Sequence, residues 1–121
     1  MAATQATLVN GVSITIATTP TALYSSPDSI APTSGKGTVI TAFTISNSSL
    51  TSVTYKCWVV PSGSVVGDAF LLVPTRTIKT LKTDVPYEVV SHIMPANSTL
   101  YVECSSASAV NVRVSGVELS A

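Results

Sequence analysis

Apolar residues recur at every second position through most of this chain, and this period constrains the fold more than any other feature. The odd positions of residues 53–59 would share one face of a strand, and they are Val53, Tyr55, Cys57 and Val59. Segments rich in Pro, Gly, Asn and Ser separate such runs, and we find no helical period. The pattern therefore predicts an all-β protein.

About eight strands are expected, joined largely by hairpins. The runs lie at residues 8–18, 38–46, 52–60, 69–73, 75–81, 85–89, 100–104 and 110–119. Outside residues 52–60, the expected inward residues include Val12, Ile14, Ile16, Val39, Thr41, Phe43, Ile45, Ile78, Leu81, Val85, Tyr87, Val89, Leu100, Val102, Cys104, Val110, Val112 and Val114. Gly116 interrupts the alternation of the last run, as at a β-bulge or a strand end. The proline-rich loop 20–36 has room for one short edge strand at Leu23 and Tyr24.

A β-sandwich of mainly antiparallel strands accommodates this number, and a jelly roll is one form of it. The 121 residues suffice for one domain with one hydrophobic core. We expect residues 1–7 to form a flexible N-terminal arm, and residues 8–121 to form the single β-sandwich domain.

The surface predicted from composition is nearly uncharged. Only 10% of the residues are charged and the formal net charge is zero, so neither nucleic acid nor an anionic membrane is an expected partner. The chain has 18 Ser and 17 Thr, and these hydroxyls replace charges as the polar coat. A neutral, hydroxyl-rich surface favours association, so a subunit of an assembly is preferred over an ordinary extracellular β domain.

The N-terminus lacks the basic region of a secretory signal, and Asn10 and Gly11 interrupt its apolar run. No stretch reaches the length of a membrane span. Synthesis in a cytoplasm is therefore expected.

Enzymatic activity, a cofactor and a metal are not expected. Cys57 and Cys104 both fall on inward faces, where two buried thiols are preferred over a disulfide, and their spacing does not suit zinc. His92 is the only histidine, and no sequence motif places a nucleophilic serine beside it. The acidic residues are scattered singly, so their spacing suggests neither a carboxylate pair nor a calcium loop.

Trp58 is the main candidate for a contact surface, because alternation turns it away from Cys57 to the outer face with Lys56 and Val60. Three interpretations remain open: a subunit or capsid contact, a residue covered by the proline-rich loop, and a platform for sugar stacking. Leu8 and Val9, at the start of the first strand, are further candidates for contact with a neighbouring subunit.

Five segments carry a resemblance in their order along the chain. They are "ALYSSP" from Ala22, "GTVITAFTISNSS" from Gly37, "VVPSGSVVGDAFLL" from Val59, "VPYEVVSHIMPANSTL" from Val85 and "SSASAVNVRVSGVEL" from Ser105. In this order, across residues 20–119, the chain resembles a group of small structural proteins of tailed bacteriophages. The sequence Met94-Pro95-Ala96-Asn97 departs from the group, which tends to have a glycine-containing turn there.

The resemblance implies a virion protein without catalytic residues. It favours a capsid decoration, or cement, protein that binds the head surface and stabilises the shell, often as a homotrimer. The implied partners are the major capsid protein or other virion proteins and further copies of the chain. A neck or tail component is the alternative, and a glycan-binding attachment module is a less favoured one.

Overall fold

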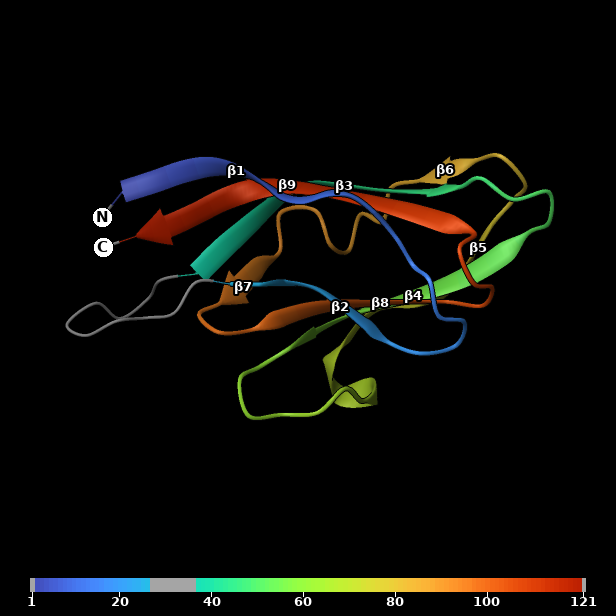
Figure 1. Cartoon of the computed structure of the whole chain (residues 1–121). Helices are drawn as coiled ribbons and strands as arrows, with labels where there is room; N and C mark the ends of the chain where they lie inside the picture. The colour runs from blue at the N-terminus through green and yellow to red at the C-terminus, as the bar shows by residue number, and fades with distance from the viewer. Residues whose placement is uncertain (1, 27–36, 121) are drawn as a thin grey trace.

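Two antiparallel sheets face each other in the computed structural model, which describes residues 2–26 and 37–120 (Figure 1). The strands are β1 (Ala2–Ser13), β2 (Thr21–Ser25), β3 (Gly37–Asn47), β4 (Val53–Val60), β5 (Leu71–Ile78), β6 (Thr83–Asp84), β7 (Ile93–Pro95), β8 (Thr99–Cys104) and β9 (Val110–Ser120). A short 3-10 helix, η1 (Asp68–Phe70), is the helical element of the described ranges. The predicted all-β sandwich is confirmed.

The first sheet has the order β1-β9-β3-β6, with β7 also paired to β3, and the second has the order β2-β8-β4-β5. β6 and β7 pair with opposite ends of β3, through Ile45 and Asp84 at one end and Thr38 and Met94 at the other. They therefore share one edge position, interrupted by residues 85–92. The nine strands fill eight positions, four in each sheet, in the order of a jelly roll.

The core lies between the sheets, and the strict alternation of three strands fills most of it. The inward residues of β4, β8 and β9 are buried as predicted, and they are Val53, Tyr55, Cys57, Val59, Leu100, Val102, Cys104, Val110, Val112 and Val114. The short edge strand expected at Leu23 and Tyr24 is also present, as β2.

A β-bulge changes which residues of β3 face the core. Val39 and Thr41 were expected to point inward, but Ile40 is buried there and Thr41 is exposed. The register of β3 against β9 shifts directly after Ile40, and the extra residue reverses the alternation. Beyond the bulge, Phe43 and Ile45 are buried as predicted.

The first strand differs from the prediction in a similar way. β1 ends at Ser13. Its register against β9 shifts at Leu8 and again at Gly11, and the φ of Gly11 is 71°, in the left-handed region. Ile14 is buried, but Val12 and Ile16, which were expected to lie beside it, are exposed.

The interruption expected at Gly116 lies on the neighbouring strands and not in β9 itself. Alternation continues through Val114 and Gly116, whereas β1 bulges at Leu8 and β3 bulges at Thr41. A Cβ atom at Gly116 would lie 2.5 Å from the backbone oxygen of Val39. Glycine is needed here because the bulged neighbours approach the backbone closely.

Residues 85–92 form successive turns where a strand was expected. Val89 is buried as predicted, but Val85 is exposed and Tyr87 is 85% exposed. Pro86 has no N–H to donate to a sheet, and its carbonyl instead accepts a hydrogen bond from the Val89 N–H at 3.1 Å.

The expected N-terminal arm lies within a strand. From Ala2 to Thr7, each residue pairs in unbroken register with residues 120 to 115 of β9. The boundary predicted between residues 7 and 8 coincides with the bulge at Leu8, and β1 continues on both sides of it.

Candidate interaction surfaces

Trp58 is covered in the folded chain. Its side chain is 5% exposed, and neither Trp58 nor Val60 belongs to the cluster of core residues between the sheets. The connection from β4 to β5 runs along the outer side of the second sheet, where η1 lies against β4 (Figure 1). Trp58 is therefore not an open surface in the single chain, which agrees with the interpretation of a covered residue, and the η1 connection lies on the same side of the sheet.

The indole nitrogen Nε1 of Trp58 is buried and has no hydrogen-bond partner within residues 2–26 and 37–120. The neighbouring candidates are also partly or fully enclosed. Val60 is buried, and Lys56 is half-buried opposite Glu103 of β8. Thus only Lys56 among the three β4 candidates reaches solvent.

Leu8 and Val9 occupy the bulge of β1. Val9 is buried in the core, and Leu8 is half-buried and packs against that core. Leu8 Cδ1 lies where it would contact a Cβ atom added at Gly116. These two residues hold β1 on the sandwich, so the backbone edge and the outward side chains of β1 are the parts that remain for contact.

A hollowed surface with a single charged side chain lies on the outer face of the first sheet. Two adjoining pockets of about 440 Å³ and about 330 Å³ share Thr7 and Ser115 in their linings. The other lining residues are Gln5, Asn10, Thr41, Ala42, Phe43, Thr44, Arg113, Gly116 and Val117. Arg113, the one charged residue of this surface, donates to the Asn10 side-chain oxygen at 2.8 Å. Apart from the Arg113 guanidinium, this hydroxyl-lined face would offer hydrogen bonds rather than charge to a partner.

β1 is an edge strand, and β9 is the strand with which it pairs within the described residues. Charged side chains and prolines usually protect an exposed edge strand from pairing with another chain. Residues 2–13 contain neither. Bulges interrupt the strand at two places, but residues 2–7 keep regular pairing. The regular half of β1 therefore offers a backbone edge to which another strand can add.

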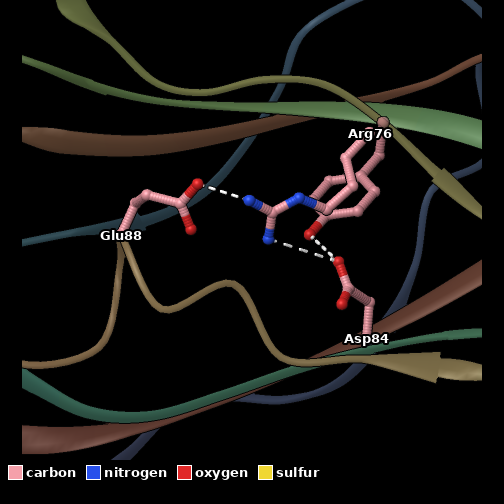
Figure 2. A network of polar contacts seen from close by, with 4 residues as sticks. Arg76, Asp84 and Glu88 are labelled. Atoms are coloured by element: carbon pink, nitrogen blue, oxygen red, sulfur yellow. Dashed lines mark hydrogen bonds and ion pairs between the residues drawn. The ribbon is translucent and has the colours of Figure 1, made fainter.

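A polar network joins the two sheets at one side (Figure 2). The Tyr55 hydroxyl donates to the Asp84 carboxylate at 2.5 Å, and Arg76 forms ion pairs with Asp84, at 3.6 Å, and with Glu88. Burial raises the pKa of Tyr55, and its hydrogen bond to Asp84 raises it further. The network ties β4 and β5 of the second sheet to β6 and the turns that follow it.

A second network joins the sheets elsewhere. The Tyr24 hydroxyl donates to the Glu118 carboxylate at 2.5 Å and lies 2.9 Å from the Thr38 hydroxyl, which in turn is 2.9 Å from that of Ser26. Burial raises the pKa of Tyr24, and the hydrogen bond to Glu118 adds to this effect. Sequence spacing did not reveal either network, because each draws on three or more elements.

The two cysteines are free and buried. Cys57 and Cys104 lie on adjacent strands, where Cys57 pairs with Val102 and Cys104 pairs with Tyr55. Burial raises the pKa of the Cys57 thiol to about 12, so it stays protonated at neutral pH. The prediction of two core thiols is confirmed.

His92 lies beside a groove of about 280 Å³ between β7 and the region of η1. Its backbone carbonyl accepts from the Ile40 N–H at 3.1 Å, which fixes the chain next to β3. Within the described part of the chain, no three His, Cys, Asp or Glu residues lie close enough to hold a metal ion. Among the described residues, no helix has both the length and the apolar character needed to cross a membrane.

Comparison with known proteins gave no match to a family model, to a curated protein or to a solved structure. The assignment of a function therefore depends on the surfaces described above and on the sequence resemblance.

Proposed function

We propose that this chain is a structural protein of a phage virion, and that it decorates the head by binding the shell as a cement protein. The observation that carries the proposal is the free edge of β1, which lies beside a hydroxyl-lined face with one charged residue, Arg113. The resemblance across residues 20–119 supports it. The fold is compatible with it as an analogy, since jelly rolls are common in viral capsids but also serve other functions.

Attachment would take place through backbone hydrogen bonds. The outer edge of residues 2–7 presents N–H and C=O groups to an extended segment of the major capsid protein or another virion protein. Gln5 and Thr7 are exposed on the same stretch, and both line the adjoining pocket. A surface of this kind contributes little long-range attraction, so binding would depend weakly on salt.

A neck or tail position would use the same edge and would differ only in the partner. Glycan binding is less favoured, because the aromatic residue best suited to stack on a sugar, Trp58, is 5% exposed.

The first experiment is to purify particles of the phage that encodes the chain and to search them for it by mass spectrometry and electron cryomicroscopy. Density on the outer surface of the head supports the proposal. Density at the neck or tail refutes the decoration role and assigns the alternative. Absence of the chain from the particles refutes a virion role altogether.

The second experiment tests the edge with charged variants. Shells that lack the chain are incubated with the wild-type chain or with the double variant Gln5→Lys, Thr7→Lys, which adds two ammonium groups to the hydroxyl-lined face. We expect binding to fall about tenfold or more. The control is Thr77→Lys, at an exposed position of β5 in the other sheet. Equal binding by both variants would refute the role of β1.

A further inference from the structure

One end of the sandwich is formed by two turns that a single buried side chain holds together. These turns, residues 48–52 and 79–82, lie at the end away from both termini (Figure 1). The Asn47 amide nitrogen donates to the carbonyls of Thr51, at 2.8 Å, and of Lys79, at 3.3 Å. The Asn47 backbone N–H donates to the Lys82 carbonyl at 2.9 Å. The two turns are therefore adjacent and fixed.

Each turn presents a leucine to solvent. Leu50 is 82% exposed and Leu81 is 64% exposed, although burial is the normal state of a leucine. Leu81 also has a φ of 56°, in the left-handed region, where glycine or asparagine is favoured and a leucine is destabilising. An apolar side chain that is exposed on a strained backbone does not stabilise the single chain, so Leu81 is a candidate for contact with a partner.

Two lysines make this end positive. Lys79 and Lys82 flank Leu81, and neither forms an ion pair within residues 2–26 and 37–120. We call Leu50, Lys79, Leu81 and Lys82 the turn end. It combines apolar area with two unneutralised positive charges, so it fits a surface that is both apolar and acidic.

Such a surface is present on the chain itself. Most of the described carboxylates already face a local partner: Asp84 and Glu88 pair with Arg76, Glu118 accepts from Tyr24, and Glu103 lies opposite Lys56. The exception is Asp68 of η1, which is exposed and has no ion pair among the described residues.

Asp68 lies close in sequence to Val65, which is 83% exposed, and next to Ala69, which is also exposed. We call Val65, Asp68 and Ala69 the η1 surface. It is located on the outer side of the second sheet, whereas the turn end closes the sandwich at one end (Figure 1). The exposure of both surfaces shows that they do not cover each other within one chain.

We propose that the turn end of one copy of this chain docks on the η1 surface of a second copy. The inference rests on the proposed role as a subunit of an assembly and specifies how the subunits meet. Because the two surfaces differ, the contact is heterologous, and repetition of it closes into a ring when the rotation permits.

Charge exchange tests this contact in the full-length chain. Association is measured by sedimentation across a concentration series at low salt, with Trp58 fluorescence as the check of folding. We expect the double variant Lys79→Glu, Lys82→Glu to weaken association about tenfold or more, and Asp68→Lys to weaken it similarly. Combining the three substitutions should restore association to within about threefold of wild type, because opposite charges again face each other.

The variant Leu81→Gly distinguishes an effect on association from an effect on the stability of the fold. It relieves the left-handed backbone and removes the apolar side chain, so the variant should unfold at higher urea concentration and yet associate about tenfold more weakly. The control is Ser91→Gly, at another exposed residue with φ of 70°, which should leave association unchanged.

Rescue by the combined charge exchange supports the proposal. A wild-type chain that stays monomeric overturns it, as does association that is insensitive to these charges or not rescued by their exchange. If the turn-end variant instead loses binding to shells while the wild type is monomeric, the occupant is a shell protein, which overturns the contact between copies but keeps the virion role. Absence of the chain from purified particles refutes the virion role alone.

Discussion

Replacement of Asn47 by alanine should destabilise the fold more than its turn position suggests. Asn47 ends β3, and its side chain is buried. The amide nitrogen lies within hydrogen-bond distance of three carbonyls, those of Thr51, Ile78 and Lys79, at 2.8, 3.1 and 3.3 Å. The amide oxygen accepts from the Ser49 N–H at 2.9 Å and from the Ser49 hydroxyl at 2.7 Å. Asn47→Ala removes all of these interactions.

The expected loss in the free energy of unfolding is worked out from the hydrogen bonds of Asn47 that water cannot replace in the variant. An amide nitrogen has two hydrogens, so two of the carbonyl interactions count in full, and each net bond contributes about 1 kcal/mol. The bond to the Ile78 carbonyl is buried, and a buried acceptor left unpaired costs about 1–3 kcal/mol. Those to Ser49 are only partly buried, so water recovers part of their contribution. We expect a loss of about 2–4 kcal/mol in the free energy of unfolding.

Urea denaturation measures this loss, with Trp58 as the single fluorescent tryptophan. With a slope of about 2 kcal/mol per molar urea, the midpoint should fall by about 1–2 M. Asn47→Asp should destabilise at least as much at neutral pH, because it sets a carboxylate against carbonyl oxygens. The control is Asn111→Ala, at an exposed position of β9. A loss below about 0.5 kcal/mol for Asn47→Ala would refute the reasoning.

Three further outcomes are expected. Trp58→Phe should change stability by less than about 1 kcal/mol in thermal unfolding, because the lost apolar area is offset by removal of a buried indole N–H without a described partner; a loss above about 3 kcal/mol would contradict this. In a Cys104→Ala background, the Cys57 thiol should not react with a disulfide reagent at pH 8 until the chain unfolds, since burial raises its pKa to about 12; rapid reaction of the native state would contradict its burial. Gly116→Ala should destabilise by about 2–3 kcal/mol in urea, because its Cβ would lie 2.5 Å from the Val39 oxygen; wild-type stability would show that the bulges adjust.

The sandwich could be predicted from the sequence because alternation is a local property. β4, β8 and β9 keep a strict period of two, and their inward residues are buried as expected. The errors in β1 and β3 occur where the period is broken by one residue. Thr41 is an extra residue in β3, and the strand on either side of it continues without a change in composition. Such a bulge is favoured by the neighbouring Gly116, which is distant in sequence, so no local signal marks it.

Trp58 shows why the contact surface was harder to predict than the fold. Alternation correctly turned Trp58 away from Cys57, but an outward direction does not establish exposure. The connection of residues 61–70 leaves β4 and returns along the outer side of the same sheet. Its glycines and serines indicate a loop, and nothing in its composition indicates which face the loop covers.

A charged side chain that is paired within the chain is not available to a partner, so candidate contact surfaces are found among the side chains that the fold leaves unpaired. In the sequence, Asp68, Asp84 and Glu88 are equivalent single carboxylates, but the fold brings Arg76 to two of them and leaves Asp68 free within the described residues. Likewise Leu81 reads as a core residue of the strand predicted at 75–81, and the turn tied by Asn47 instead exposes it. In a chain with so few charges, each unpaired one is informative, because there are few others to neutralise it across the surface.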